Sequence, residues 1–148
     1  MHRFVGFAIL LFLCAGCFAN RDDHEGFPLE PDPTYVPAEG DRVALYDADS
    51  AESEQGIPLL TDMTSYDKYE RALREEDSQA LEALKAEAKL DFTPTGTNIF
   101  LEKIHDRQHT GARMAAEVKL LDGRLQGKTF WTPIAKVARL RKPIPEPE

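Results

Sequence analysis

Both cysteines of the chain, Cys14 and Cys17, lie close to its start, at the end of a short apolar run. The residues that follow contain no cysteine, so any domain they form cannot have an intramolecular disulfide. Such a domain has to be stabilised by its hydrophobic core alone. About 130 residues follow Cys17, which is enough for one domain with a core of this kind. The same distribution excludes catalysis by a cysteine nucleophile in that domain.

The residues before Cys17 have the pattern of an export signal. Met1-His2-Arg3 is a short basic start, and the apolar run extends from Phe4 to Leu13. That run is about half as long as the stretch of roughly 20 apolar residues that a helix needs to span a bilayer. Polar residues follow from Asn20 onward. We therefore expect residues 1–16 to be an export signal rather than a membrane-spanning helix.

The tripeptide Ala15-Gly16-Cys17 resembles the end of bacterial lipoprotein signals, the lipobox. The resemblance implies that Cys17 is lipidated and anchors the protein in the cell envelope, on the periplasmic face of the inner or outer membrane. Two alternatives stay open: secretion after cleavage behind Ala19, and an anchor that is not cleaved. The Cys-x-x-Cys spacing also suggests a redox or metal site, but both cysteines belong to the apolar signal, which disfavours that interpretation.

Charge is distributed unevenly along the chain. The chain has 18 basic and 26 acidic residues, for a formal net charge of −8. Acidic residues dominate between Arg21 and Gly56, whereas basic residues outnumber acidic ones between Phe92 and Glu148. Because an acidic exported protein is repelled by nucleic acid, we expect no nucleic-acid partner. The basic excess of the C-terminal part is weak and mainly indicates a solvated surface.

Composition divides the chain into four segments. After the signal, residues 17–40 contain several prolines among acidic residues and no apolar periodicity, which predicts an extended spacer. Residues 41–140 carry the apolar periodicity of a folded domain. Residues 141–148 alternate proline with other residues, which predicts a short extended tail.

Within residues 41–140 the apolar period predicts strands on both sides of a helical region. Thr64 and Asp77 are expected to cap two short helices within about residues 65–89, because both residue types accept hydrogen bonds from helix amides. Pro58 predicts an edge or irregular position for its strand. The expected inner faces of the helices comprise Tyr66, Tyr69, Leu73, Leu81, Leu84 and Ala88. The expected strands are 42–46, 57–60, 90–93, 98–104, 116–121, 129–132 and 137–140, with a helical turn at 133–136.

The C-terminal half of this domain resembles the bacterial Src-homology-3-like barrel. Gly96-Thr97 precedes an alternating strand, Asp122-Gly123 follows another, and Phe130-Trp131-Thr132-Pro133 stands where Gly-Trp-Val-Pro is usual. The match runs from Thr93 to Leu140. The resemblance implies an α+β fold, a small Src-homology-3-like β-barrel with the pair of short helices inserted, and peptide or cell-wall partners.

Four aromatic residues form the candidate binding groove. The resemblance implies that Trp131, beside Phe130, either lines a peptide-binding groove or fills the barrel, and Tyr66 and Tyr69 are placed to cover it from the helices. A core or helix-docking position for Trp131 is the favoured alternative, because large aromatic side chains dominate small cores. An exposed patch of Phe130 and Trp131 would instead favour binding.

Other sites have weaker signals. His105 and His109 have a spacing that could bind a metal on a helix, but the neighbouring Thr110-Gly111 predicts a surface loop, and zinc sites need three or four protein ligands. No Gly-x-Ser-x-Gly, phosphate-binding glycine loop or His-Glu-x-x-His motif is present. We therefore expect no metal site, no cofactor and no catalytic residues.

The sequence predicts a lipid-anchored protein of the cell envelope with a small binding or scaffolding domain and no enzymatic activity. The expected partners are the membrane, through Cys17, and a peptide or cell-wall component. A secreted soluble structural protein is the alternative. An envelope enzyme is less favoured, because it would need a constellation of residues that the sequence does not reveal.

Overall fold

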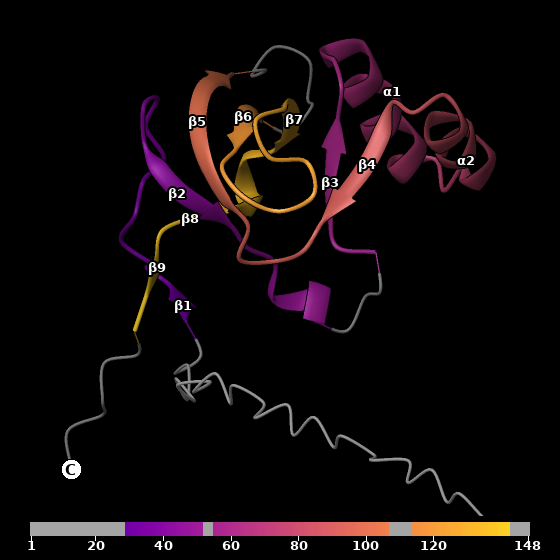
Figure 1. The fold of residues 1–148 in the computed structure, drawn as a ribbon. Coiled ribbons are helices and arrows are strands. Elements are labelled where there is room, and N and C mark those ends of the chain that lie inside the picture. Colours follow the sequence, from indigo (N-terminus) through magenta and orange to yellow (C-terminus); the bar gives the residue numbers. More distant parts are fainter. Residues whose placement is uncertain (1–28, 52–54, 107–113, 143–148) are drawn as a thin grey trace, which may run out of the picture.

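Alternating apolar residues form the strands of one curved antiparallel sheet. The structure, a computed structural model, describes residues 29–51, 55–106 and 114–142. In these ranges seven strands are ordered β4-β3-β7-β6-β5-β2-β8 across the sheet (Figure 1). The strands are β2 (Arg42–Leu45), β3 (Ile57–Leu60), β4 (Leu90–Thr93), β5 (Asn98–His105), β6 (Ala115–Leu120), β7 (Thr129–Pro133) and β8 (Val137–Ala138). Together with two helices, this sheet confirms the predicted α+β class.

The strand positions agree closely with the apolar pattern. All but the last predicted strand are found with bounds that differ by no more than one residue. The last one, 137–140, is divided at Arg139 into β8 and β9 (Leu140–Arg141). The predicted helical turn is present at Ile134–Lys136. Short strands with clear alternation are therefore specified locally by this sequence.

The sheet does not close into a barrel in the described ranges. Its end strands, β4 and β8, do not pair with each other, so the predicted barrel is replaced by an open, curved sheet (Figure 1). The β4 edge is protected, because the backbone N–H of Phe92 donates to the Asp91 carboxylate at 2.8 Å. A donor that could pair with a further strand is thereby occupied. The helix α2 also packs against β4.

The helical region consists of α1 (Met63–Arg74) and α2 (Ser78–Ala86), which confirms the prediction of two helices. Asp77 caps α2 as predicted, accepting a hydrogen bond from the Ala80 N–H at 3.0 Å. The predicted Thr64 cap is wrong: α1 begins one residue before Thr64, and the Asp62 carboxylate accepts from the Ser65 N–H at 2.7 Å. In the described ranges, no helix is both long and apolar enough to cross a bilayer.

The buried faces of the helices differ from the prediction at their ends. Tyr66, Tyr69 and Leu84 are buried as expected. Leu73 was expected inside but is 45% exposed, while its neighbour Ala72 is buried. Leu81 is half-buried, and the exposed Ala88 lies beyond the end of α2. The helices therefore bury less apolar surface than their sequence pattern suggests.

The strand β3 lies between β4 and β7, so the predicted edge position of Pro58 is wrong. The alternative prediction, an irregular position, agrees with the pairing of β3 and β7, whose register contains only Leu60 opposite Trp131. Proline has no N–H for a strand ladder, and the Pro58 carbonyl accepts a hydrogen bond from the Thr132 hydroxyl at 2.9 Å. The turn before β3 requires Gly56, which has φ +82° and lies so close to the Thr93 carbonyl oxygen that a Cβ would be 2.6 Å from it.

A second, two-stranded sheet joins the two ends of the described chain. It consists of β1 (Glu30–Pro31) and β9 and is called the clasp here. Residues of the predicted spacer contact the domain beyond the clasp: the Tyr35 hydroxyl donates to Asp41 at 2.7 Å, and the Gly40 N–H donates to the Leu101 carbonyl at 2.8 Å. Figure 1 shows the clasp at the opposite end of the domain from α1 and α2.

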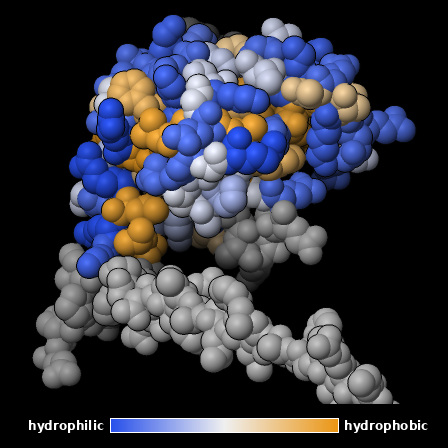
Figure 2. Space-filling model, in the orientation of Figure 1, coloured by the Kyte–Doolittle hydropathy of each residue, from blue (hydrophilic) through white to orange (hydrophobic). Residues whose placement is uncertain are grey.

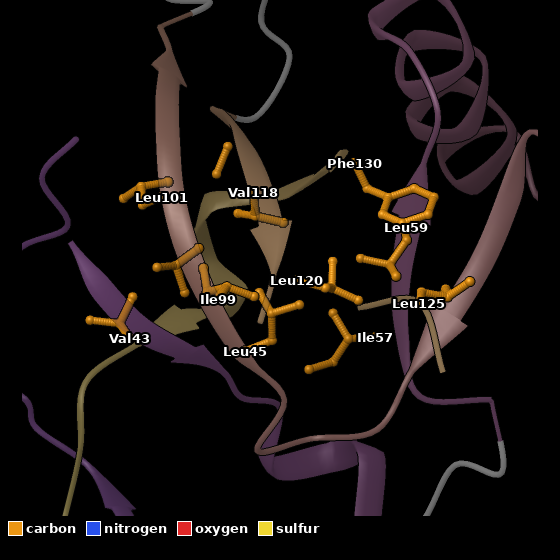
Figure 3. Close-up of a cluster of buried hydrophobic side chains, with 12 residues drawn as sticks. Val43, Leu45, Ile57, Leu59, Ile99, Leu101, Val118, Leu120, Leu125 and Phe130 are labelled. Atoms are coloured by element: carbon orange, nitrogen blue, oxygen red, sulfur yellow. The ribbon is translucent and has the colours of Figure 1, made fainter. Parts of the chain in front are cut away.

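The domain has two hydrophobic clusters, which we call the sheet core and the helix core. The sheet core fills the hollow of the curved sheet, where its side chains converge from β2, β3, β5, β6 and β7 (Figure 3). The helix core contains buried residues from the helices and the adjoining strands, with four partly buried residues packed against them. The helix core comprises Leu60, Tyr66, Tyr69, Leu84, Leu90 and Ala115, packed against Met63, Leu81, Phe92 and Trp131.

Candidate functional site

The predicted pair of Phe130 and Trp131 is not one surface. Successive residues of a strand point to opposite faces of the sheet. Phe130 is accordingly buried in the sheet core with 6% exposure, whereas Trp131 is half-buried and packs against the helix core. The two residues therefore form no shared exposed patch, and the favoured helix-docking position of Trp131 is confirmed.

Tyr66 and Tyr69 lie in the helix core against which Trp131 packs, so the structure brings three of the four predicted groove residues into one cluster. Tyr66 is fully buried, and Tyr69 is 9% exposed. A fully buried side chain cannot contact a ligand without rearrangement of the core. Tyr66 is therefore a packing residue, and of the two tyrosines only Tyr69 remains near the surface.

His105 ends β5 rather than starting a loop, so the predicted loop begins at least one residue later. Its ring meets the Trp131 ring edge-on, with centroids 6.2 Å apart and planes at 82°. His109 lies outside the described residues. In the part of the chain that the structure describes, no three His, Cys, Asp or Glu residues are grouped to hold a metal ion. The expectations of no metal and no cofactor stay predictions.

An apolar groove lies between the helix pair and β4, and we call it the helix groove. Its cavity volume is about 240 Å³. Tyr69 and Leu73 contribute from α1, Leu81 from α2, and Leu90 and Phe92 from β4. Polar residues complete the lining: Gln55, Ser78, Glu82 and Lys85. Leu73, the large apolar residue left exposed at the end of α1, thus borders a concave site rather than open solvent.

The charges at the helix groove neutralise each other. The Lys85 ammonium lies 2.8 Å from the Glu82 carboxylate and 5.8 Å from the centroid of the Phe92 ring. An ammonium over an aromatic face is attracted by the ring quadrupole and covers part of the ring. The described lining contains no histidine. The chemistry therefore suits an uncharged apolar side chain rather than acid–base catalysis.

A second cavity of about 220 Å³ lies between α1 and α2. Its lining mixes both signs of charge with small side chains, and its only large apolar side chain is Leu84. Lys68, Arg71, Glu75, Asp77 and Glu87 surround Ala72, Ala80, Ala83 and Leu84. We consider the helix groove the better candidate, because large apolar and aromatic side chains supply most of the binding energy in such sites.

The displaced pKa values belong to groups outside both cavities. Hydrogen bonds from Thr34 lower the pKa of Asp32, the Tyr35 hydroxyl lowers that of Asp41, and the Lys136 ammonium lowers that of Asp47. Burial, reinforced by the hydrogen bond to Asp41, raises the pKa of Tyr35 to about 12. These four shifts each have a partner that fastens the chain around the clasp or β2, and the Ser65 N–H lowers the pKa of Asp62 at the start of α1, so all of these groups have a structural explanation.

Sequence reasoning found Tyr69 but missed the rest of the helix groove. Leu73 and Leu81 were assigned to inner faces, and Phe92 was read as an ordinary strand residue. The sequence gives no local signal for the groove, because Leu73 and Leu81 fit the inner faces of their helices. Searches against protein-family models, curated proteins and solved structures give no match to this chain.

Proposed function

We propose that this chain is a lipid-anchored protein of the cell envelope whose domain binds a polypeptide segment in the helix groove. The observation that carries the binding role is the helix groove itself, where exposed Leu73 borders a concave apolar cavity. The segment inserts an aliphatic or aromatic side chain, and the absence of a net charge at Glu82 and Lys85 fits an uncharged one.

The envelope location rests on the residues before Asn20. The basic start, the short apolar run and Ala15-Gly16-Cys17 support export and lipidation at Cys17. The domain itself contains no cysteine, which is consistent with stability from the two cores alone. Mass spectrometry of the mature N-terminus tests this part: an acylated Cys17 is expected, and an acyl-free N-terminus at Asn20 would contradict it.

The curved sheet also supports a proposal about architecture. Strands β5, β6 and β7, the turn at Asp122-Gly123 and the helical turn after Pro133 follow the order of the bacterial Src-homology-3-like barrel. We assign the domain to that architecture in an opened form, with α1 and α2 inserted between β3 and β4. The insertion creates the helix groove, which that minimal order of strands and turns does not contain.

The binding role is tested by NMR titration of the folded domain with cell-wall stem peptides and with short synthetic peptides that carry one leucine or phenylalanine. We expect chemical-shift changes at Tyr69, Leu73, Leu81 and Phe92, and no comparable changes around Trp131. Leu73→Glu should abolish the changes, because it places a charge in the apolar groove while altering an exposed position that the fold tolerates.

The matched control is Leu29→Glu, which makes the same substitution at another exposed leucine, at the clasp end of the domain. This variant should bind like the wild type. Chemical-shift changes centred on Trp131 and His105 would place the binding site at these two side chains instead of in the helix groove. No shifts with any peptide would favour the structural alternative, in which the domain has no ligand.

A further inference from the structure

Two of the four large apolar side chains that are exposed among the described residues belong to the clasp end of the domain. Leu29, directly before β1, is 50% exposed, and Val36, shortly after it, is 79% exposed. Among the described residues the only other large apolar side chains with comparable exposure are Leu73 and Met114. Figure 2 shows a hydrophobic patch at the end where β1 and β9 lie, bordered by hydrophilic residues. We call this surface the anchor pole.

Basic residues accompany the apolar ones at the anchor pole. Arg139 and Lys142 are exposed, and Arg141 lies opposite Glu30 in the clasp. Of the nearby acidic side chains, Asp32 and Asp41 are engaged within the protein, by Arg141 at 3.9 Å and by the Tyr35 hydroxyl at 2.7 Å, while Glu30 is exposed. The Arg139 guanidinium lies 4.7 Å from the Tyr35 ring centroid, which keeps its charge at the surface. Exposed aliphatic groups beside cations are the combination that peripheral proteins present to lipid headgroups.

The length of the chain before the clasp keeps this pole close to the anchor. Only twelve residues lead from Cys17 to Leu29 (29 minus 17). Even fully extended, a chain of this length spans only about 40 Å. The anchor pole is the part of the domain to which this chain attaches. Tethering over so short a distance gives the pole a high effective concentration at the bilayer, so weak apolar contacts suffice for docking.

We propose that the anchor pole docks on the lipid bilayer, with Leu29 and Val36 at the headgroup–acyl boundary and Arg139 and Lys142 at the headgroups. This inference rests on the proposed lipidation of Cys17. Docking fixes the orientation of the domain: the helix groove, at the opposite end, then faces away from the membrane (Figure 1). The groove is thereby presented to polypeptides outside the bilayer.

The experiment uses the lipidated full-length mature protein in vesicles of phosphatidylethanolamine and phosphatidylglycerol. In the variant Val36→Cys an environment-sensitive fluorophore is attached at position 36, where Cys17 does not compete because its sulfur carries the lipid. The matched control is Leu73→Cys, labelled at an exposed apolar position of the helix groove. We expect blue-shifted emission and quenching by spin-labelled lipids at position 36 only.

A substitution tests the apolar contact. Leu29 is exposed, so Leu29→Ser should leave the fold and the circular dichroism spectrum unchanged. The substitution should lower the ratio of docked to undocked protein by about tenfold. Equal, water-like emission at positions 36 and 73 would overturn the inference. A blue shift at position 36 that depends on protein concentration but not on lipid would overturn it too, because the pole would then contact a second copy.

The two proposals fail in distinguishable ways. Mass spectrometry of the same sample shows whether Cys17 is acylated. If it is not, the chain from Phe18 onward is tethered by an N-terminal histidine tag to vesicles that contain nickel-chelating lipid, and the same labels are compared. Docking of the tagged protein would support the proposed role of the anchor pole, although the predicted lipidation of Cys17 would be wrong. Absence of docking would overturn both proposals.

Discussion

The sheet core and the helix core lie on opposite faces of the same sheet, and they differ in how completely they are enclosed. The sheet core is surrounded by strands from both halves of the chain, and only three partly buried residues, Tyr35, Ile104 and Ile134, pack against its twelve buried members. The helix core is covered from one side by two short helices, and Leu81, Phe92 and Trp131 remain partly exposed around it. The enclosed core explains the fold, and the partly covered core provides the surface for a ligand.

The largest effect is expected at β3, where Leu59 and Leu60 are adjacent, both fully buried, and face different cores. Leu59→Ala should lower the free energy of unfolding by about 3–4 kcal/mol, because the strands around the sheet core cannot move to fill the cavity. Leu60→Ala should cost about 2–3 kcal/mol, because the helices can shift and partly close theirs. Denaturant unfolding of the two variants measures both values.

This pair matches residue type, burial and strand, so the difference reports the core alone. Equal losses would mean that the helix layer is as rigid as the sheet. A larger loss for Leu60→Ala would reverse the comparison and make the helix core the main source of stability.

A smaller effect, confined to the helix layer, is expected from the cap of α1. Asp62→Ala removes the acceptor for the Ser65 N–H and should cost about 1 kcal/mol. The same hydrogen bond lowers the pKa of Asp62, so its stabilisation is present at neutral pH and is lost as the pH falls through that lowered pKa. Hydrogen exchange should accelerate in α1 before β5 and β6, and equal acceleration in all three would contradict a separable helix layer.

The smallest effect at neutral pH concerns Tyr35, which packs against the sheet core from the segment after the clasp. Its pKa is raised to about 12, so the folded state keeps a proton that the unfolded state loses above the ordinary phenol pKa of 10.0. Stability is therefore full below that ordinary value and falls as the pH rises through about 12. Tyr35→Phe should be slightly less stable at neutral pH and should lack this alkaline loss.

Thermal unfolding of both proteins across this pH range isolates the contribution of Tyr35, because the remaining tyrosines and lysines titrate in each. Parallel curves would show that the segment from Asp32 to Asp41 detaches from the sheet core at high pH for a reason other than the ionisation of Tyr35. The prediction extends the comparison of the two cores to the segment from Asp32 to Asp41, which packs against the sheet core through Tyr35.

The strands could be predicted because their information is local. Ile99 and Leu101, for example, alternate with the more exposed Asn98, Phe100 and Glu102, which assigns them to one face of the sheet. The same rule, applied to adjacent Phe130 and Trp131, assigns them to opposite faces, so the predicted shared patch could have been rejected from the sequence. The Asp62 cap was missed because Thr64 with Asp67 also fits a capping pattern, and only the register of α1 decides between them.

The helix groove could not be predicted because it depends on long-range packing. Leu73 and Leu81 fit the inner faces of their helices, and nothing local indicates that Leu73 lies beyond the area that the sheet covers. Likewise, the open end of the sheet depends on the Asp91 carboxylate, which occupies the Phe92 N–H, and on the position of α2 beside β4. The strand pattern alone is compatible with closure.

The pairing of Glu30 with Arg141 brings the first and last described strands of the chain together. A folded unit whose ends are neighbours can be inserted into a surface turn of a host protein without distorting that protein. Its ends can also be joined by a short linker, and new ends can be made at another position of the chain. A fluorescent reporter fused directly behind Lys142 would consequently lie beside the tether and leave the far side of the molecule unobstructed.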